Sequence, residues 1–168
     1  MSPKKSAGPT TSAPALQPLD RLVGAWTTEA THPAFPGVIV RGTVTIEWLE
    51  GERFLIHRAR TDHPDFPDMI AIIGFTDRDR AGEASANDPK TGGAPELTMH
   101  YFDSRGVFRV YKAGVDDEAW RVWRDAPGFS QRYTGTFADG GDAIFGRWQL
   151  CQDDVRWNDD LQITYRRS

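Results

Sequence analysis

Apolar and polar residues alternate along most of the chain from Leu22 onward, and clusters of turn-forming residues interrupt the alternation at regular intervals. Because a period of two places successive side chains on opposite faces of a strand, the pattern predicts an all-β protein. Ten strands are expected, at residues 22–32, 38–49, 53–61, 68–77, 96–102, 106–114, 118–125, 129–138, 143–151 and 155–166. Short connections between consecutive strands predict a ten-stranded antiparallel up-and-down β-barrel.

The segments outside these strands differ from them in composition. Residues 1–17 are rich in Pro, Ser, Thr and Ala and carry too little apolar surface to fold, so we expect a disordered tail. Residues 18–168 are expected to form the barrel domain, which begins with a short helical turn at 18–23. The segment 78–95, rich in Asp, Gly and Ala, follows an even-numbered strand and is expected at the closed end of the barrel.

The last hairpin determines which side chains of the final strand face the interior, since paired residues lie on the same face of a sheet. A two-residue turn at 152–153 would pair Trp148 with Trp157. In the same register Gly146 pairs with Asp159, and both pairs face inward. A single acid beside glycine on an apolar face suggests a cavity. The alternatives are a hydrogen bond to a neighbouring ring and a bulge that turns Asp159 outward.

Two earlier turns bring further side chains inside. The turn at 139–142 would place Tyr133 on the inward face, opposite a tryptophan. The turn at 50–51 would place His57 there as well, although a loop one residue longer would bring Arg58 inside instead. A histidine in such a position can exchange a proton near neutral pH, or it can be a hydrogen-bonded core residue.

Composition narrows the range of functions. The 168-residue chain has a single cysteine, which excludes a disulfide framework and fits a reducing compartment, so we expect a cytoplasmic protein. With 24 acidic and 20 basic residues it lacks the charge for nucleic-acid binding, and no apolar run is long enough to span a membrane. The unusual feature is the content of six Trp, most of which the alternation places inside the barrel.

The segment Leu22–Trp26, with the sequence Leu-Val-Gly-Ala-Trp, follows the expected helical turn and opens the first strand. It resembles the Gly-x-Trp start of calycins, the superfamily of lipocalins and fatty-acid-binding proteins. The resemblance implies that Trp26 closes one end of the barrel and that Arg166 or Arg167 packs over it. The barrel segment also resembles uncharacterised bacterial lipocalin-like domains through the Tyr-Phe-Asp-Ser-Arg-Gly turn at 101–106, which implies a fold and no chemistry.

Two better understood relatives can be compared residue by residue. Nitrobindins share a ten-stranded barrel and bind haem through a His on a late strand, whereas the last His here is His100, so neither haem nor another cofactor is expected. Fatty-acid-binding proteins hold a carboxylate with an inward Arg-x-Tyr on the last strand. The corresponding inward residue here is Asp159, which would repel a carboxylate, so the resemblance does not extend to fatty acids.

Loops that follow odd-numbered strands lie at one end of an up-and-down barrel. Two of them carry the repeat His-Pro-x-Phe-Pro, which projects Phe35 and Phe66, and a third carries Phe129. Three phenyl rings on proline-stiffened loops predict an apolar mouth, and the alternative is that each ring tucks into the core. Arg124 lies at the same rim and either meets a polar end of a ligand or extends into solvent.

The other histidines carry a weaker signal. His32 and His63 lie at the expected mouth with Asp65 beside them, but nothing in their spacing requires a metal ion, and no metal site is expected. His100 and Arg109 are expected to form a pair on the outer face of the barrel.

The inward side chains predict the binding of a small apolar or aromatic molecule inside the barrel. The site is expected to consist of His57, Trp120, Tyr133, Trp148, Trp157 and Asp159. One alternative is an enclosed isomerase, cyclase or hydrolase in which Asp159 and His57 exchange protons. Another is a filled barrel that acts through its surface or as an oligomer, with a homodimer left open. Because no nucleophile elbow, phosphate-binding loop or metal cluster is visible, binding is preferred over catalysis.

Overall fold

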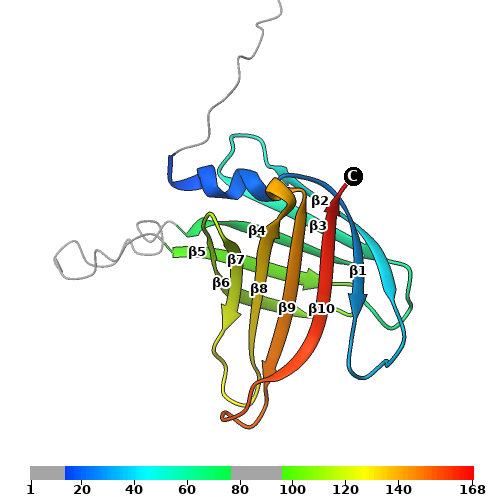
Figure 1. Cartoon of the computed structure of the whole chain (residues 1–168). Coiled ribbons are helices and arrows are strands. Elements are labelled where there is room, and N and C mark those ends of the chain that lie inside the picture. The colour runs from blue at the N-terminus through cyan, green and yellow to red at the C-terminus, as the bar shows by residue number, and fades with distance from the viewer. Residues whose placement is uncertain (1–13, 77–95) are drawn as a thin grey trace, which may run out of the picture.

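The structure is a computed structural model that describes residues 14–76 and 96–168 (Figure 1). The expectations for residues 1–13 and for the segment 78–95 therefore lie outside the described residues. The assignment of residues 14–17 to the disordered tail is wrong, because they belong to a helix and Leu16 packs into the core. A 3₁₀ helix, η1 (Pro14–Leu22), precedes the first strand, and a single 3₁₀ turn, η3 (Asp139–Gly141), joins two later ones. The strands are β1 (Gly24–Thr31), β2 (Val40–Trp48), β3 (Phe54–Thr61), β4 (Met69–Thr76), β5 (Glu96–Asp103), β6 (Phe108–Val115), β7 (Ala119–Arg124), β8 (Ser130–Ala138), β9 (Ala143–Cys151) and β10 (Asn158–Arg167).

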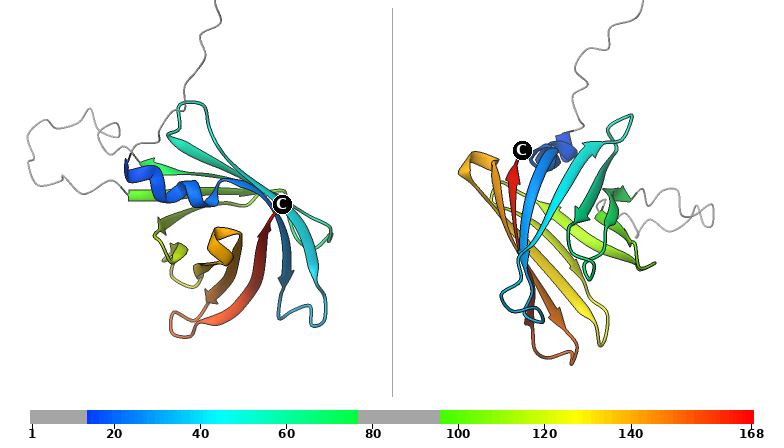
Figure 2. Two further views of the ribbon diagram at one scale, coloured as in Figure 1. Left: turned by 45° about the horizontal axis from the view of Figure 1, so that its top comes forward. Right: turned by 90° about the vertical axis from the view of Figure 1, so that its right-hand side faces the viewer.

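The strands close into one barrel. Each strand pairs antiparallel with its neighbours in the chain, and β1 pairs with β10, so the order around the barrel is β1-β10-β9-β8-β7-β6-β5-β4-β3-β2. The predicted ten-stranded antiparallel up-and-down barrel is confirmed (Figure 2). None of the helices in the described ranges is long and apolar enough to cross a membrane.

The alternation that predicts the strands also separates the core from the outer surface. In β1, Trp26, Thr28 and Ala30 are buried and the residues between them are exposed. The same period of two continues in β2 and β8. The largest fully buried side chains are Trp26, Tyr133, Leu19, Leu22, Ile46, Leu55, Ile73, Ile144 and Val122.

Helix η1 lies across one end of the barrel, which we call the closed end (Figure 2). The indole N–H of Trp26 donates to the Leu22 carbonyl at 3.0 Å, and the Arg167 guanidinium lies 4.2 Å from the centre of the Trp26 ring. Glycine is favoured at Gly24, because its φ of +144° is one that other residues rarely adopt. The positions of Trp26 and Arg167 are those implied by the calycin resemblance, whereas Arg166 lies 3.7 Å from the Asp139 carboxylate instead.

The hairpin between β9 and β10 differs from the prediction. Its connection spans residues 152–157 instead of two residues, because the Asp153 carboxylate accepts the backbone N–H of Val155 at 3.0 Å and holds a wider turn. The pairing of β9 with β10 then shifts register after Asp159. The predicted pairings that place Trp157 and Asp159 on the inward face are therefore wrong.

Other hairpins agree with the prediction in part. Tyr133 pairs with Trp148 as predicted. The predicted two-residue turn at 50–51 is wrong, because the connection spans residues 49–53 and His57 pairs with Ile46. His57 still faces inward and is buried, since a register shift of two residues keeps a side chain on the same face. The hairpin between β5 and β6 has a connection one residue longer than expected, so Arg109 pairs with Tyr101. A slip of one residue moves a side chain to the other face of a strand. Arg109 accordingly shares its face with the buried residues of β6, and its predicted position on the outer surface is wrong.

The outer face of β4, β5 and β6 is unusually apolar. Ile70, Phe102 and Phe108 are exposed cross-strand neighbours, and the rings of Phe102 and Phe108 stack with their centres 5.0 Å apart. Val110 is exposed beside them. We call these four residues the outer apolar patch. It lies on the opposite side of the barrel wall from the residues described next.

Candidate functional site

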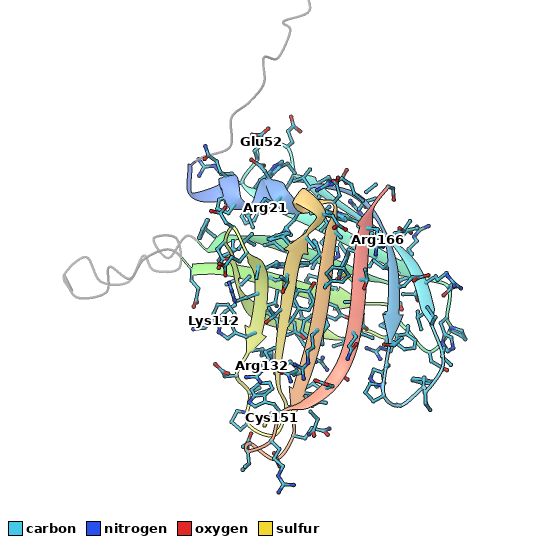
Figure 3. The ribbon with its side chains drawn as sticks, in the orientation of Figure 1. Arg21, Glu52, Lys112, Arg132, Cys151 and Arg166 are labelled. Carbon is cyan, nitrogen blue, oxygen red and sulfur yellow. The ribbon has the colours of Figure 1, made fainter. Side chains whose placement is uncertain are left out.

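A continuous set of aromatic rings occupies the barrel interior. From the closed end outward it consists of Trp26, Tyr165, Trp120, Tyr133, Trp148, Tyr111 and Tyr101, and we call it the aromatic column. Neighbouring ring centres lie 5.1 to 6.4 Å apart, and most pairs meet edge to face. Aromatic pairs in this geometry stabilise one another by about 0.5–1.5 kcal/mol beyond the area they bury. Figure 3 shows Arg21 at the closed end and Cys151 at the opposite end, which we call the open end.

Gly135 and Gly146, which pair with each other across β8 and β9, make room for one of these rings. A Cβ at Gly146 would lie 2.6 Å from the hydroxyl oxygen of Tyr133, and a Cβ at Gly135 would collide with the same hydroxyl. Glycine in a strand interior commonly marks such a close approach. The space beside Gly135 and Gly146 is therefore filled by the Tyr133 ring and is not the cavity that the sequence suggests.

Three side chains in the middle of the barrel carry buried polar atoms without a hydrogen-bond partner. These atoms are Nδ1 and Nε2 of His57, Nε1 of Trp120 and the hydroxyl of Tyr133, which interacts with the Tyr165 hydroxyl without forming a hydrogen bond of normal length and angle. The three rings are in contact, since Trp120 lies 5.7 Å from His57 and 5.1 Å from Tyr133, measured between ring centres. A buried polar group without a partner costs about 1–3 kcal/mol. So many such atoms in one place are unusual for a folded protein.

Burial decides the charge of this cluster. It lowers the pKa of His57 to about 4 and raises the pKa of Tyr133 well above its ordinary value of 10. At neutral pH the imidazole is therefore neutral, with one nitrogen as donor and the other as acceptor, and the phenol keeps its proton. The cluster presents donors from Trp120, Tyr133 and His57 and at least one acceptor, and it carries no charge.

Asp159 and Trp157 lie outside the barrel, so the prediction that they line its interior is wrong. The Asp159 carboxylate accepts hydrogen bonds from Arg147 at 2.7 Å and from Gln149 at 3.2 Å, and Arg147 holds its pKa below the ordinary value. Trp157 lies in the β9–β10 connection, where the Arg132 guanidinium lies 4.2 Å from the centre of its ring. The alternative in which a bulge turns Asp159 outward is the one observed.

The two His-Pro-x-Phe-Pro loops pack against each other at the open end. The rings of Phe35 and Phe66 lie 5.5 Å apart, and His32 and His63 each contact both of them. Each histidine accepts, through Nδ1, the backbone N–H of the residue two positions later, so both loops have the same local geometry. Two of the three predicted mouth phenylalanines are thus in contact, and they are only half-buried.

The third mouth residue, Phe129, lies among arginines. The Arg109 guanidinium lies 4.7 Å from the centre of its ring, and Nη1 of Arg124 donates to its carbonyl oxygen at 3.2 Å. The carboxamide oxygen of Gln131 accepts hydrogen bonds from Arg109 at 2.9 Å and from the Tyr111 hydroxyl at 2.8 Å. The sequence does not predict a site role for Arg109, Tyr111 or Gln131, because the expected register of β6 places Arg109 on the outer face. The alternation of Arg109, Tyr111 and an alanine along β6 is the signal that could have found them.

Two surface pockets lie beside the open-end loops. One, of about 200 Å³, is lined by His32, Phe35 and Asp159 among others, and the second, of about 400 Å³, by His63 and Phe66 among others. Neither includes a residue of the aromatic column. In the described part of the chain, no three His, Cys, Asp or Glu side chains gather closely enough to hold a metal ion.

Comparison with known proteins supports the architecture. No protein-family model matches the chain, and no curated protein matches it either. The structure is similar to the crystal structure of Rv2717c from M. tuberculosis, with a TM-score of 0.59 and 16% sequence identity over 94% of this chain and 99% of that one. At this identity the similarity shows the fold alone. A barrel of this kind is compatible with the binding of a small molecule.

Proposed function

We propose that this protein binds a small molecule inside its barrel, against His57, Trp120 and Tyr133. The observation that carries the proposal is the set of four unpaired polar atoms on three touching, buried rings. The backbone N–H and C=O groups of the surrounding strands are engaged in the sheet, so they offer these atoms few partners. A ligand with its own donors and acceptors would remove the cost of the unpaired atoms, and that gain is part of its binding energy.

The chemistry of the cluster describes the buried part of the ligand. Because His57 and Tyr133 are uncharged at neutral pH, that part of the ligand is uncharged and carries both a donor and an acceptor. Since the three side chains present aromatic rings, a flat part of the ligand would pack well against them. The Gly-x-Trp start and the Arg167 contact support a calycin-like barrel, in which a ligand enters at the open end past Phe35 and Phe66.

The enzymatic alternative requires Asp159 and His57 to exchange protons inside the barrel, and only His57 lies there. Asp159 is on the outer surface, bound to Arg147, whereas His57 is fully buried inside the barrel. Without Asp159, His57 has no carboxylate partner among the described residues to orient it. The filled-barrel alternative accounts for the close ring packing but leaves the four polar atoms unexplained.

A neutral fluorescent probe tests the proposal. N-phenyl-1-naphthylamine carries two aromatic groups and one N–H, and its emission rises in an apolar site. We expect it to bind the full-length protein, and we expect Tyr133→Phe to weaken binding several-fold to about tenfold, the value of one hydrogen bond. Trp157→Phe, which changes a ring on the outer surface, is the matched control and leaves binding unchanged.

Stability separates a ligand site from simple packing. Without ligand, Tyr133→Phe removes a buried hydroxyl whose one neighbour, the Tyr165 hydroxyl, forms no hydrogen bond of normal geometry with it, so the free energy of unfolding is expected to stay unchanged or to rise by up to about 1 kcal/mol. Tyr111→Phe removes a hydroxyl that is bonded to Gln131 and is expected to lower it by about 1 kcal/mol. If Tyr133→Phe lowers stability as Tyr111→Phe does and leaves probe binding intact, the proposal is wrong.

A further inference from the structure

We infer that the open end of the barrel contains an anion-binding site formed by Arg109 and Arg124, and that the ligand carries a carboxylate or similar anionic group there. The inference rests on the proposed function for the rest of the ligand, whose aromatic part would lie along the aromatic column. The ligand would then be anionic, would enter at the open end and would keep its anionic group there.

The two guanidinium groups are held around a single residue. Arg109 lies over the Phe129 ring and Arg124 donates to the Phe129 carbonyl. Both side chains are half-buried. Burial raises the pKa of the Tyr111 hydroxyl, and the positive charges of Arg109 and Arg124 offset part of that rise. Both positive charges therefore act on the same point, at the outer part of the aromatic column.

Neither arginine forms an ion pair within residues 14–76 and 96–168. Other arginines of the barrel do so, each with a carboxylate; they are Arg21, Arg41, Arg58, Arg105, Arg121, Arg147, Arg166 and Arg167. Partly buried cations are normally paired, because removing a charge from water is costly. An anion from a ligand is the partner that these two arginines fit.

Two acids of the open end, Asp160 and Asp103, already have partners. Asp160, whose charge also acts on Tyr111, accepts a hydrogen bond from His32 at 2.9 Å. The side chain of Asp103 is fully buried and accepts hydrogen bonds from Tyr101 and Arg105 at 2.9 and 2.7 Å. Among the half-buried arginines of the described ranges, Arg21 and Arg121 have a carboxylate partner, whereas Arg109 and Arg124 have none.

A hydrogen bond to Gln131 holds the Arg109 guanidinium in place. Gln131, itself buried, holds one nitrogen of the guanidinium, whereas the group has five N–H donors in a planar fork that matches a carboxylate. Tyr111 shares the same Gln131 oxygen, and its ring leads to Trp148, 5.8 Å away between centres. An aromatic carboxylate would thus place its anion at Arg109 and its ring against the column.

Asp159 does not oppose an anionic ligand. From the sequence, an inward Asp159 is expected to repel a carboxylate. Since Asp159 is outside and paired with Arg147, it does not face the ligand. The charge that faces the interior from β6 and β7 is positive instead.

Two dyes with the same ring system test the inference. 1-Anilinonaphthalene-8-sulfonate differs from N-phenyl-1-naphthylamine by one sulfonate. We expect the full-length protein to bind the sulfonate dye about tenfold more tightly, the value of one charge-assisted contact. Arg109→Gln and Arg124→Gln should each weaken the sulfonate dye at least several-fold while leaving the neutral dye within about twofold. The control, Arg132→Gln, removes the same charge from the outer surface and should change neither.

Several results would overturn the inference. It is wrong if the two dyes bind equally, or if Arg132→Gln weakens the sulfonate dye as much as Arg109→Gln does. It is also wrong if Phe108→Ser, which disrupts the outer apolar patch, abolishes sulfonate binding. Arg109→Lys keeps the charge and should retain the preference, which separates loss of charge from loss of structure.

The two proposals fail in different ways. Neutral-dye binding that depends on Tyr133, without any sulfonate preference, would leave the interior site standing and reject the anion site. Sulfonate binding that depends on Arg109 but not on Tyr133 would support the anion site and reject the interior site. Failure of the sulfonate dye to bind the unsubstituted protein rejects the anion site whatever the neutral dye does.

Discussion

Trp26 and Trp120 belong to the same aromatic column and are almost equally buried, yet their indole N–H groups differ in hydrogen bonding. Trp26 donates to the Leu22 carbonyl and lies beneath Arg167, whereas Trp120 has no partner. At the closed end, helix η1 supplies free carbonyl groups, but in mid-barrel the sheet already uses the backbone groups. Trp26 therefore has a structural role, and Trp120 lies where a bound molecule can supply the missing partner.

The largest effect is expected at the closed end. Trp26→Ala removes a fully buried ring, its hydrogen bond and the Arg167 contact, and should lower the free energy of unfolding by about 3–5 kcal/mol. Urea unfolding followed by circular dichroism measures it. Trp157→Ala, on the outer surface, should cost about 1 kcal/mol or less. Equal losses for the two variants would show that Trp26 does not hold the closed end together.

A pH effect of about 3 kcal/mol is expected in mid-barrel. In the unfolded chain His57 has a pKa near 6.5, whereas burial lowers its pKa to about 4 in the folded protein. The unfolded state therefore takes up the proton first, so stability falls as the pH drops from about 6.5 toward 4 and this contribution is constant below 4.

The control for the pH effect is His57→Gln, which cannot be protonated. Urea unfolding of both proteins between pH 7 and pH 4 separates His57 from the carboxylates, which are common to both. The difference in stability between the two proteins should change by about 3 kcal/mol over this range. Parallel curves would mean that His57 is solvated in the folded protein and does not belong to a dry cluster.

A smaller effect tests the position of the Tyr133 ring. Gly146→Ala introduces a methyl group 2.6 Å from Tyr133 atoms and should cost about 1–3 kcal/mol. Gly114→Ala is the matched control, because its nearest neighbour, a Trp123 carbon, is 3.9 Å away, and it should change stability by about 0.5 kcal/mol or less. If thermal unfolding shows no difference between the two variants, the Tyr133 ring does not occupy the space beside Gly146.

The sequence predicts strand number and order well because each strand is a local pattern with period two. It also predicts the short turn at 139–142, and with it the pairing of Tyr133 with Trp148. It fails where a side chain widens a turn, as the Asp153 carboxylate does before β10. Turn-forming residues mark such a connection, but its length depends on hydrogen bonds that a linear pattern does not contain.

The candidate site shows the same division. His57, Trp120, Tyr133 and Trp148 are predicted to face inward, and the structure brings them into contact along the column. Asp159 is predicted inside and lies outside, whereas Arg109 is predicted outside and lies inside. Both predictions are wrong because two hairpins have a longer connection than expected. A slip of one residue reverses the face of every side chain in a strand, so charge inside a barrel is the property most sensitive to register.

The sequence by itself determines an all-β barrel with ten strands and an interior rich in aromatic rings. These properties follow from alternation and composition, which are local and additive. Only the tertiary structure decides which rings keep unpaired polar atoms and which charges face the interior. Both depend on contacts between strands that are distant in the chain, and a single added residue in a turn changes them.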